Sequence, residues 1–192
     1  VQTMNELRHE LVEAAPAFDA AELGGATSLL LLTGVAAQVR AREAALGRPA
    51  REDELEPLTW QVVRLGQSVS GIDYASQFAR INRQVRRIGA FFESVDVLLT
   101  ATTATPPPAL GALSTQTHTL ESFQQAMAGF CPFTGAFNAT GQPAVNLPLH
   151  WTQDGLPLGV QLVGRFGDDA GLLQLAAQLE QARPWFQRTA PL

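Results

Sequence analysis

The spacing of apolar residues changes near residue 95, and this change restricts the folds open to the chain. Before it, apolar side chains recur every three or four residues, as they do on one face of a helix. After it, short runs rich in β-branched residues lie between turn-forming residues, which is typical of buried strands. We therefore predict a mainly helical region over residues 1–94 and a sheet-forming region with a closing helix over residues 95–192. The clearest helical face consists of six residues: Tyr74, Phe78, Ile81, Val85, Ile88 and Phe92.

Capping residues and helix breakers predict where several helices begin and end. The long helix that carries this face should start at a capping box made by Ser70 and Asp73. A helix over Ser28–Leu46 is closed by Gly47, which suits the left-handed turn at a helix end. Another helix over Pro57–Val69 has a proline in its first turn, where proline is tolerated.

The two ends of the chain carry further helix signals. A capping-box pattern over Thr3–Glu6 predicts a helix, although Glu10–Ala15 fits a short strand equally well. Near the other end, apolar residues at helical spacing over Leu172–Leu179 predict a helix with Asp168 or Asp169 as its N-cap.

Three short apolar runs are predicted to be neighbouring strands of one sheet: Val95–Thr102, Ala144–His150 and Leu158–Val163. The turn Asp154-Gly155 joins the last two. Helices before, between and after the strands indicate the α/β class. Three strands make a thin sheet. We therefore expect an α/β/α fold whose strands complete a mixed sheet begun on other chain, with residues 1–192 forming a single partial domain.

Composition excludes several kinds of chemistry. All thirteen basic residues are arginine, so no lysine is present to act as a base, a Schiff-base former or a P-loop residue. A net charge of -5 and a pI near 5.1 argue against nucleic-acid binding. The single cysteine, Cys131, rules out an internal disulfide and favours a cytoplasmic protein. The longest apolar stretch, Ser28–Val39, is too short to cross a bilayer, so we expect no membrane segment.

Few residues combine into a recognisable reactive site. His9, His118 and His150 have no second ligand at metal-binding spacing, so we expect no metal and no cofactor. The loop Gly164–Gly167 could hold a phosphate at the start of a helix, but the acidic first turn of that helix favours a plain cap. Four arginines of the long helix are interpreted as a solvated face, with an anion site or an ion pair to other chain as alternatives: Arg80, Arg83, Arg86 and Arg87.

A segment rich in small and aromatic residues joins a short helix to the second strand. Pro132 suits the first turn of that helix, Gly141 suits its left-handed C-terminal turn, and Pro143 follows at the entry into the strand. Such joints often line a ligand pocket, although side-chain packing explains the same composition. Both interpretations stay open on these residues alone.

Three segments, in order and spacing, resemble the C-terminal part of the amidase signature enzymes. They are VDVLLTATTATPPP from Val95, FTGAFNATGQPAVNLPL from Phe133 and DGLPLGVQLVGRFGDDAGLLQLAAQLEQARPW from Asp154. Upstream, RHELVEAAP and LEPLTWQVVRLGQSVSGIDY are similar to the 6-aminohexanoate-cyclic-dimer hydrolase branch of the family. The resemblance covers most of the chain and is strongest after residue 90.

The resemblance implies hydrolysis of a carboxamide by a Ser, cis-Ser, Lys triad, with an oxyanion site in a Gly/Ser-rich loop. The chain has no lysine and no such loop. The family places that machinery in its N-terminal half, so we expect the C-terminal portion of an amidase, inactive alone. The expected partners are a small-molecule amide substrate and the N-terminal half of the amidase, with a homo-oligomer left open. A non-catalytic binding module derived from the same fold is the alternative.

The resemblance also implies four substrate-binding positions. Thr134 and Phe137 match positions where family members line the acyl-binding channel, and Asn138 and Gly141 match the recurrent N-x-x-G of the joint. One departure lies at the end of the first strand, where the family usually has a proline between two threonines and this chain has Thr100-Ala101-Thr102. We expect the loop there, and the choice of substrate, to differ accordingly.

Overall fold

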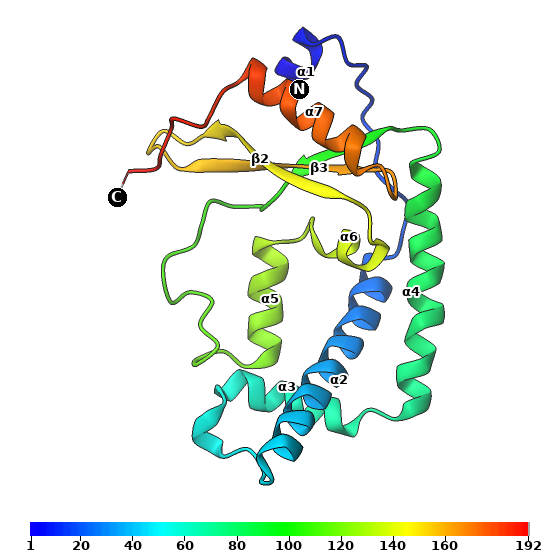
Figure 1. The fold of residues 1–192 in the computed structure, drawn as a ribbon, viewed down its shortest axis with the longest axis vertical. Helices are drawn as coiled ribbons and strands as arrows, with labels where there is room; N and C mark the ends of the chain where they lie inside the picture. The colour runs from blue at the N-terminus through cyan, green and yellow to red at the C-terminus, as the bar shows by residue number, and fades with distance from the viewer. Residues whose placement is uncertain (192) are drawn as a thin grey trace. The chain divides into compact units, whose positions relative to one another are not determined.

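A computed structural model describes residues 1–191 of the chain (Figure 1). Helices predominate before residue 95, and all the strands follow it, as predicted from the apolar spacing. In chain order the elements are α1 (Gln2–Glu6), α2 (Ala20–Leu46), the 3₁₀ helix η1 (Glu52–Glu54), α3 (Pro57–Ser68), α4 (Gly71–Phe91), β1 (Val97–Ala101), α5 (Leu120–Phe130), α6 (Gly135–Thr140), β2 (Ala144–Trp151), β3 (Pro157–Gly164) and α7 (Asp169–Ala182).

The residues group into two compact units, each built from separate stretches of chain. The sheet unit contains Val1–Phe18, Val85–Pro106 and the described residues from Phe133 onward. The helical unit contains Asp19–Gln84 and Pro107–Pro132. The units therefore interleave along the chain instead of dividing at residue 94. That the chain forms a single partial domain stays a prediction.

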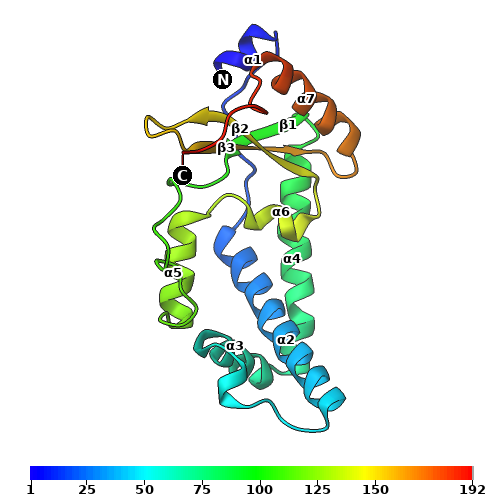
Figure 2. The same cartoon turned by 60° about the vertical axis from the view of Figure 1, so that its left-hand side comes forward.

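The sheet unit contains one three-stranded sheet in the order β1-β3-β2. The prediction that these strands share a sheet is confirmed. Both pairs are antiparallel, with Leu99 opposite Leu162 and Val145 also opposite Leu162. The three strands thus contain none of the parallel pairing that a mixed sheet requires. Figures 1 and 2 show α1 and α7 on one face of the sheet and α6 on the other.

A hydrophobic core lies between the sheet and the two helices on its first face. Leu162 and Leu179 have no exposed surface, which places β3 and α7 at its centre. Burying aliphatic side chains of this size contributes about 1.5–3 kcal/mol each. The buried members of this core are Met4, Leu147, Leu162, Leu172, Ala176 and Leu179.

In the helical unit, α2 packs closely against α3. Gly66 of α3 lies so near the backbone of Leu32 that an added Cβ would come within 2.1 Å of the Leu32 carbonyl oxygen. The start of α2 is bound to α4 through Glu22, which accepts hydrogen bonds from Arg83 and Gln84. Arg80, Arg83, Arg86 and Arg87 are all exposed, in agreement with the predicted solvated face. Arg83 in addition has an ion-pair partner within the chain, Glu22.

Several helix ends agree with the predicted caps. Ser70 Oγ accepts a hydrogen bond from the backbone N–H of Asp73 at 3.0 Å, at the start of α4. Asp168 caps α7 by accepting from the N–H of Gly171 at 3.0 Å. Gly47 ends α2 in the left-handed conformation with φ of 65°. These features are local in sequence, which explains why the sequence reveals them.

Other helix predictions were wrong. The first helix ends at Glu6 and has Val1 at its N-cap, without a side-chain cap. The segment Glu10–Ala15 is neither helix nor strand, because no described strand pairs with it. Helix α2 begins eight residues before the predicted Ser28, since the Asp19 side chain caps it and helix–helix packing outweighs the low propensity of its glycines. Helix α5, which was not predicted, starts at a Thr119 cap.

Helix α2 is long and apolar. Its 27 residues include an 18-residue window with a mean hydropathy of 1.4, enough by length and composition to cross a membrane. The sequence prediction considered only the apolar stretch Ser28–Val39, which is shorter than this helix, and therefore missed a segment of membrane-spanning length. A core helix of a soluble protein meets the same criteria, although only 17% of this window is buried here. Length and composition alone do not assign the helix to a membrane.

Candidate functional site

The predicted joint between a short helix and the second strand is present in the sheet unit. Thr134 stands at the N-cap of α6, although its side chain makes no capping hydrogen bond. Gly141 ends the helix with φ of 69°, and its N–H donates to the carbonyl of Phe137 at 3.0 Å. This left-handed turn is where glycine is favoured, and it directs the chain into β2.

The four predicted substrate-binding residues differ in exposure. Phe137 is buried, at 7% exposed, whereas Thr134 is half-buried. Asn138 and Gly141 are exposed. Phe137 therefore packs inside this unit, while the other three reach its surface to different degrees. The substrate-binding roles of all four stay predictions.

A buried glutamine connects this joint to the sheet. Gln161, in the middle strand β3, is 5% exposed. Its Nε2 donates to Thr100 Oγ1 at 3.0 Å and to the backbone carbonyl of Phe133 at 3.3 Å. Burying an amide is unfavourable unless it is hydrogen-bonded. These two bonds fix the chain just before α6 against β1 and β3.

Two further polar side chains lie on the same face of the sheet. Asn146 of β2 pairs with Gln161 in the register, and Thr102, which follows β1, donates from Oγ1 to Asn146 Oδ1 at 2.5 Å. Gly159 lies between them, where an added Cβ would come within 2.2 Å of Asn146 Oδ1. We call Thr100, Thr102, Asn146 and Gln161 the polar sheet face. It offers neutral hydroxyl and amide groups that suit hydrogen bonding to an amide.

Sequence reasoning missed the polar sheet face. Its signal was present in the strand period: Thr100 and Thr102 occupy alternate positions, as do Gly159 and Gln161, within otherwise apolar runs. Alternate residues of a strand point to the same face. The partners across the sheet depended on the strand order, which the sequence did not reveal.

Gln142, next to the joint, carries an unsatisfied polar atom. Its Nε2 donates to the carbonyl of Gly164 at 3.0 Å. Its Oε1 is buried and has no hydrogen-bond partner among residues 1–191. A buried amide oxygen without a donor costs about 1–3 kcal/mol. This atom marks a position beside the joint where an additional donor would be stabilising.

The loop Gly164–Gly167 before α7 was considered as a phosphate site, but the side chains around it do not favour an anion. The Asp168 carboxylate occupies the N-terminus of the helix, as the capping interpretation expected. Arg165 is turned toward other groups: its Nε donates to the carbonyl of Phe92 at 3.0 Å, and its guanidinium pairs with Asp96 at 2.7 Å. The loop is thus a capped and ion-paired connection.

The histidines and the cysteine are dispersed. His9 contacts Gln178 Oε1 at 2.8 Å. Both ring nitrogens of His118 are engaged, with Ser122 Oγ at 3.0 Å and the Ala112 carbonyl at 2.9 Å. Across residues 1–191, no group of three His, Cys, Asp or Glu side chains is arranged to hold a metal ion.

Two carboxylates of the helical unit have lowered pKa values because they are ion-paired. Hydrogen bonds from Arg83 and Gln84 lower the pKa of Glu22. A bidentate contact with Arg48, at 2.7 and 2.9 Å, lowers the pKa of Glu54 to about 2, with a further contribution from the backbone N–H of Arg51. The side-chain partners of both carboxylates are the arginines and the glutamine that hold the helical unit together, so we assign both to structure.

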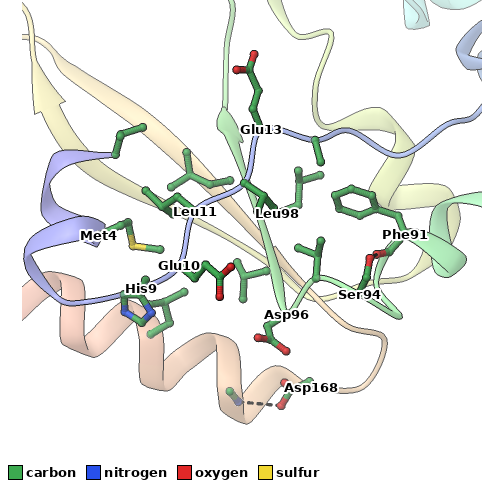
Figure 3. Close-up of a pocket in the computed structure, with 18 of the residues that line it drawn as sticks. Met4, His9, Glu10, Leu11, Glu13, Phe91, Ser94, Asp96, Leu98 and Asp168 are labelled. Atoms are coloured by element: carbon green, nitrogen blue, oxygen red, sulfur yellow. Dashed lines mark hydrogen bonds between the residues drawn. The ribbon is translucent and has the colours of Figure 1, made fainter.

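A cavity of about 1230 Å³ lies in the sheet unit, away from the joint (Figure 3). One wall is the extended segment His9–Ala14, and another is Val95–Leu99, which includes the start of β1. Residues of α7, including Leu175, form a third wall. None of the four predicted substrate-binding residues lines this cavity.

Known proteins share both the sequence and the fold. The amidase family matches residues 1–173. The 6-aminohexanoate-cyclic-dimer hydrolase of Paenarthrobacter ureafaciens is 34% identical over 164 residues, which cover 82% of this chain and 33% of that protein. The chain belongs to the amidase family. A hydrolase of the same name from Pseudomonas sp. (strain NK87) is 33% identical over the same length.

The amidase fold is equally clear in three dimensions. The solved structure of 6-aminohexanoate cyclic dimer hydrolase complexed with substrate has a TM-score of 0.85 and 31% identity, and covers 96% of this chain and 40% of that one. A crystal structure of an amidase with a TM-score of 0.76 shares the fold. The α/β class and the resemblance to amidase signature enzymes are confirmed. The chain spans about a third of the length of the curated relatives that it matches.

Proposed function

We propose that this chain is the C-terminal portion of an amidase that hydrolyses carbon–nitrogen amide bonds. The observation that carries the proposal is the match to the 6-aminohexanoate-cyclic-dimer hydrolase of Paenarthrobacter ureafaciens, at 34% identity over 82% of this chain. The fold agrees over 96% of the chain with a structure of an enzyme of that name. The substrate is then a small molecule with an amide bond.

The proposed chemistry is that of the Ser, cis-Ser, Lys triad. A serine oxygen attacks the amide carbonyl, its proton passes through the bridging serine to a neutral lysine, and the amine leaves with a proton. Water then releases the acid from the acyl-enzyme. This chain contains no lysine. We therefore assign the triad and its oxyanion site to the part of the amidase that this chain does not span.

The proposed task of this chain is to complete the sheet and form the acyl side of the substrate pocket. Thr134 and Asn138 would present polar groups at the joint, Gly141 would set its turn, and Phe137 would support the wall from within the unit. The hydrogen bonds from Gln161 support this role, because they hold the start of the joint rigidly on the sheet.

Exposed apolar residues support the presence of further chain. Tyr74 and Phe78, two members of the predicted helical face, are 42% and 47% exposed, while Ile88 at the other end of that face is fully buried. Leu31 of the apolar helix α2 is 61% exposed. Large exposed apolar patches mark interaction sites. We propose that the remaining amidase chain, or another copy in a homo-oligomer, covers them in a cytoplasmic protein.

The proposal is tested by complementation. The purified chain is assayed for release of amine from short amides and from the cyclic dimer of 6-aminohexanoate. It is then mixed with the part of the Paenarthrobacter hydrolase that lies outside the matched region. We expect no turnover by the chain alone, because losing a catalytic unit removes about four or more orders of magnitude in rate.

Turnover should appear only in the mixture. The matched control is the same mixture with serine replaced by alanine throughout the Gly/Ser-rich loop of the added piece, which should be inactive. Turnover by the chain alone after removal of contaminating hydrolases would refute the assignment of the triad elsewhere. Stable association with no turnover on any amide would favour the non-catalytic module instead. Recovery of the chain only from membranes would contradict the cytoplasmic location.

A further inference from the structure

The side of the sheet opposite the hydrophobic core has an apolar half and a polar half. In the apolar half, Leu98 and Val163 are opposite each other in the register, and both are buried. In the polar half, Asn146 is exposed, and Thr100 and Thr102 are half-buried. The polar sheet face is therefore the part of this side that the described residues leave open.

The polar sheet face lies beside the joint that carries the predicted substrate-binding residues. Gln161 Nε2 donates both to Thr100 Oγ1 and to the backbone carbonyl of Phe133. Phe133 directly precedes Thr134, which stands at the N-cap of α6. A substrate held at the joint would therefore lie close to the polar sheet face, within the same compact unit.

Hydrogen bonds within the chain leave donors of the polar sheet face unused. Thr102 Oγ1 donates to Asn146 Oδ1 at 2.5 Å, which engages the acceptor end of that amide. Among the described residues, neither Asn146 Nδ2 nor the hydroxyl hydrogen of Thr100 has an acceptor. An asparagine amide nitrogen and a threonine hydroxyl are both donors. The free groups therefore suit the oxygen of a carbonyl group.

The strands that carry the polar sheet face have no acidic residue, arginine or lysine. The sequences of β1, β2 and β3 are VLLTA, AVNLPLHW and PLGVQLVG. A charged group placed against these strands would lose water without gaining an ion-pair partner on them, which is unfavourable. A neutral carbonyl group loses less solvation and gains hydrogen bonds. The polar sheet face therefore favours a neutral amide over a carboxylate.

We propose that Asn146 and Thr100 bind a second amide carbonyl in the acyl part of the substrate, so that the amidase prefers diamides to monoamides. The inference rests on the proposed function, because it requires the joint to form the acyl side of the pocket. Asn146 Nδ2 and the Thr100 hydroxyl donate to the carbonyl oxygen, and Thr102 orients the Asn146 amide through Oδ1. Asn146 and Thr100 are thus specificity residues, and Thr102 is a positioning residue.

The test compares diamides with monoamides of equal chain length. The chain is mixed with the part of the Paenarthrobacter hydrolase outside the matched region. In this mixture kcat/KM is measured for malonamide, succinamide, glutaramide and adipamide, and for propanamide, butanamide, pentanamide and hexanamide. For at least one chain length the diamide should be preferred at least about fivefold, the effect of one hydrogen bond, after correction for its pair of equivalent amide bonds. The monoamide of adipic acid, which carries a carboxylate, should be a poorer substrate than adipamide.

Three variants assign the preference to Asn146. Asn146→Asp keeps the side-chain shape and the bond from Thr102 but loses the N–H donors, so the ratio of diamide to monoamide kcat/KM should fall at least about fivefold. It should also favour 6-aminohexanamide over hexanamide, because a carboxylate attracts the ammonium group. Gly159→Ala displaces the Asn146 amide, since the new Cβ would lie 2.2 Å from Oδ1, and should lower the same ratio. Gln153→Glu makes the same amide-to-carboxylate change in the exposed turn between β2 and β3, and should leave the ratio unaltered.

A second measurement does not require turnover. In NMR spectra of the isotope-labelled chain, alone and in the mixture, the side-chain amide signals of Asn146 should shift more on addition of adipamide than of hexanamide. An unchanged ratio in Asn146→Asp, an equal fall in Gln153→Glu, or the lack of a selective shift would overturn the inference. A selective shift without turnover would refute only the proposed function. Turnover without any preference for diamides would refute only this inference.

Discussion

Replacing Gly66 by alanine tests the close packing of α2 on α3. An added Cβ would lie 2.1 Å from the carbonyl oxygen of Leu32, 2.6 Å from its carbonyl carbon and 2.9 Å from Ala36 Cβ. The first two atoms belong to the backbone of α2, so no side-chain rotation relieves the contact. The helices must move apart or the new methyl group must distort one of them.

Two opposing effects set the change in free energy of unfolding that Gly66→Ala should cause. Alanine in place of glycine stabilises a helix interior by up to about 1 kcal/mol. Overpacking typically costs about 1–3 kcal/mol, and contact with backbone belongs at the upper end of that range. The Gly66→Ala variant should therefore lose about 2 kcal/mol in free energy of unfolding. The control Gly34→Ala lies in α2 with no atom within 4 Å of the new Cβ, and it should gain about 0.5–1 kcal/mol.

Urea unfolding followed by far-ultraviolet circular dichroism measures both variants. Trp60, which lies in α3, provides a second probe by fluorescence for the same helix pair. The midpoints should move in opposite directions, downward for Gly66→Ala and upward for Gly34→Ala. A Gly66→Ala chain as stable as the unmodified one would refute the close approach of the two helices.

Three further predictions concern other parts of the chain. Gly159→Ala places a Cβ within 2.2 Å of Asn146 Oδ1, but the Asn146 side chain is exposed and can turn away, so the variant should lose only the Thr102–Asn146 hydrogen bond, at most about 1.5 kcal/mol in urea unfolding; a loss of about 3 kcal/mol would contradict this geometry. Because Arg48 lowers the pKa of Glu54 to about 2, the stability from this pair is present above the unfolded pKa near 4.5 and is lost as the pH falls from there toward 2. In the Glu54→Gln variant the melting temperature should fall less than in the unmodified chain as the pH drops over that interval. An identical dependence of melting temperature on pH in both proteins would argue against the ion pair. Phe137→Ala should cost about 3–5 kcal/mol in free energy of unfolding because the side chain is buried, and in the complemented enzyme it should also change the preference among acyl chains; an unchanged preference would assign Phe137 to packing alone.

Local signals predicted a large part of this fold. The caps made by Ser70 and Asp168 and the left-handed glycines Gly47 and Gly141 involve neighbours within a few residues, so the sequence alone reveals them. The positions of the three strands follow from short apolar runs in the same way. Helix α2 began earlier than predicted because tertiary packing compensates for glycine in its first turns.

The candidate site was less accessible to sequence reasoning. The positions of Thr134, Phe137, Asn138 and Gly141 came from motif resemblance, and the joint that carries them was evident from its prolines and glycines. The contact of Gln161 with Thr100 and Phe133 was not, because it joins residues 61 and 28 positions apart.

The sequence by itself determined the α/β class, the helix caps, the three strands, the absence of lysine and the resemblance to amidases, because each depends on residue identity or on neighbours a few positions apart. Only the tertiary structure decided that β3 lies between β1 and β2, that the two units interleave along the chain, and that polar side chains of all three strands meet on one face of the sheet. These features arise from pairing and packing between distant segments. Many pairings are compatible with the same local pattern, and the burial of the whole chain selects among them.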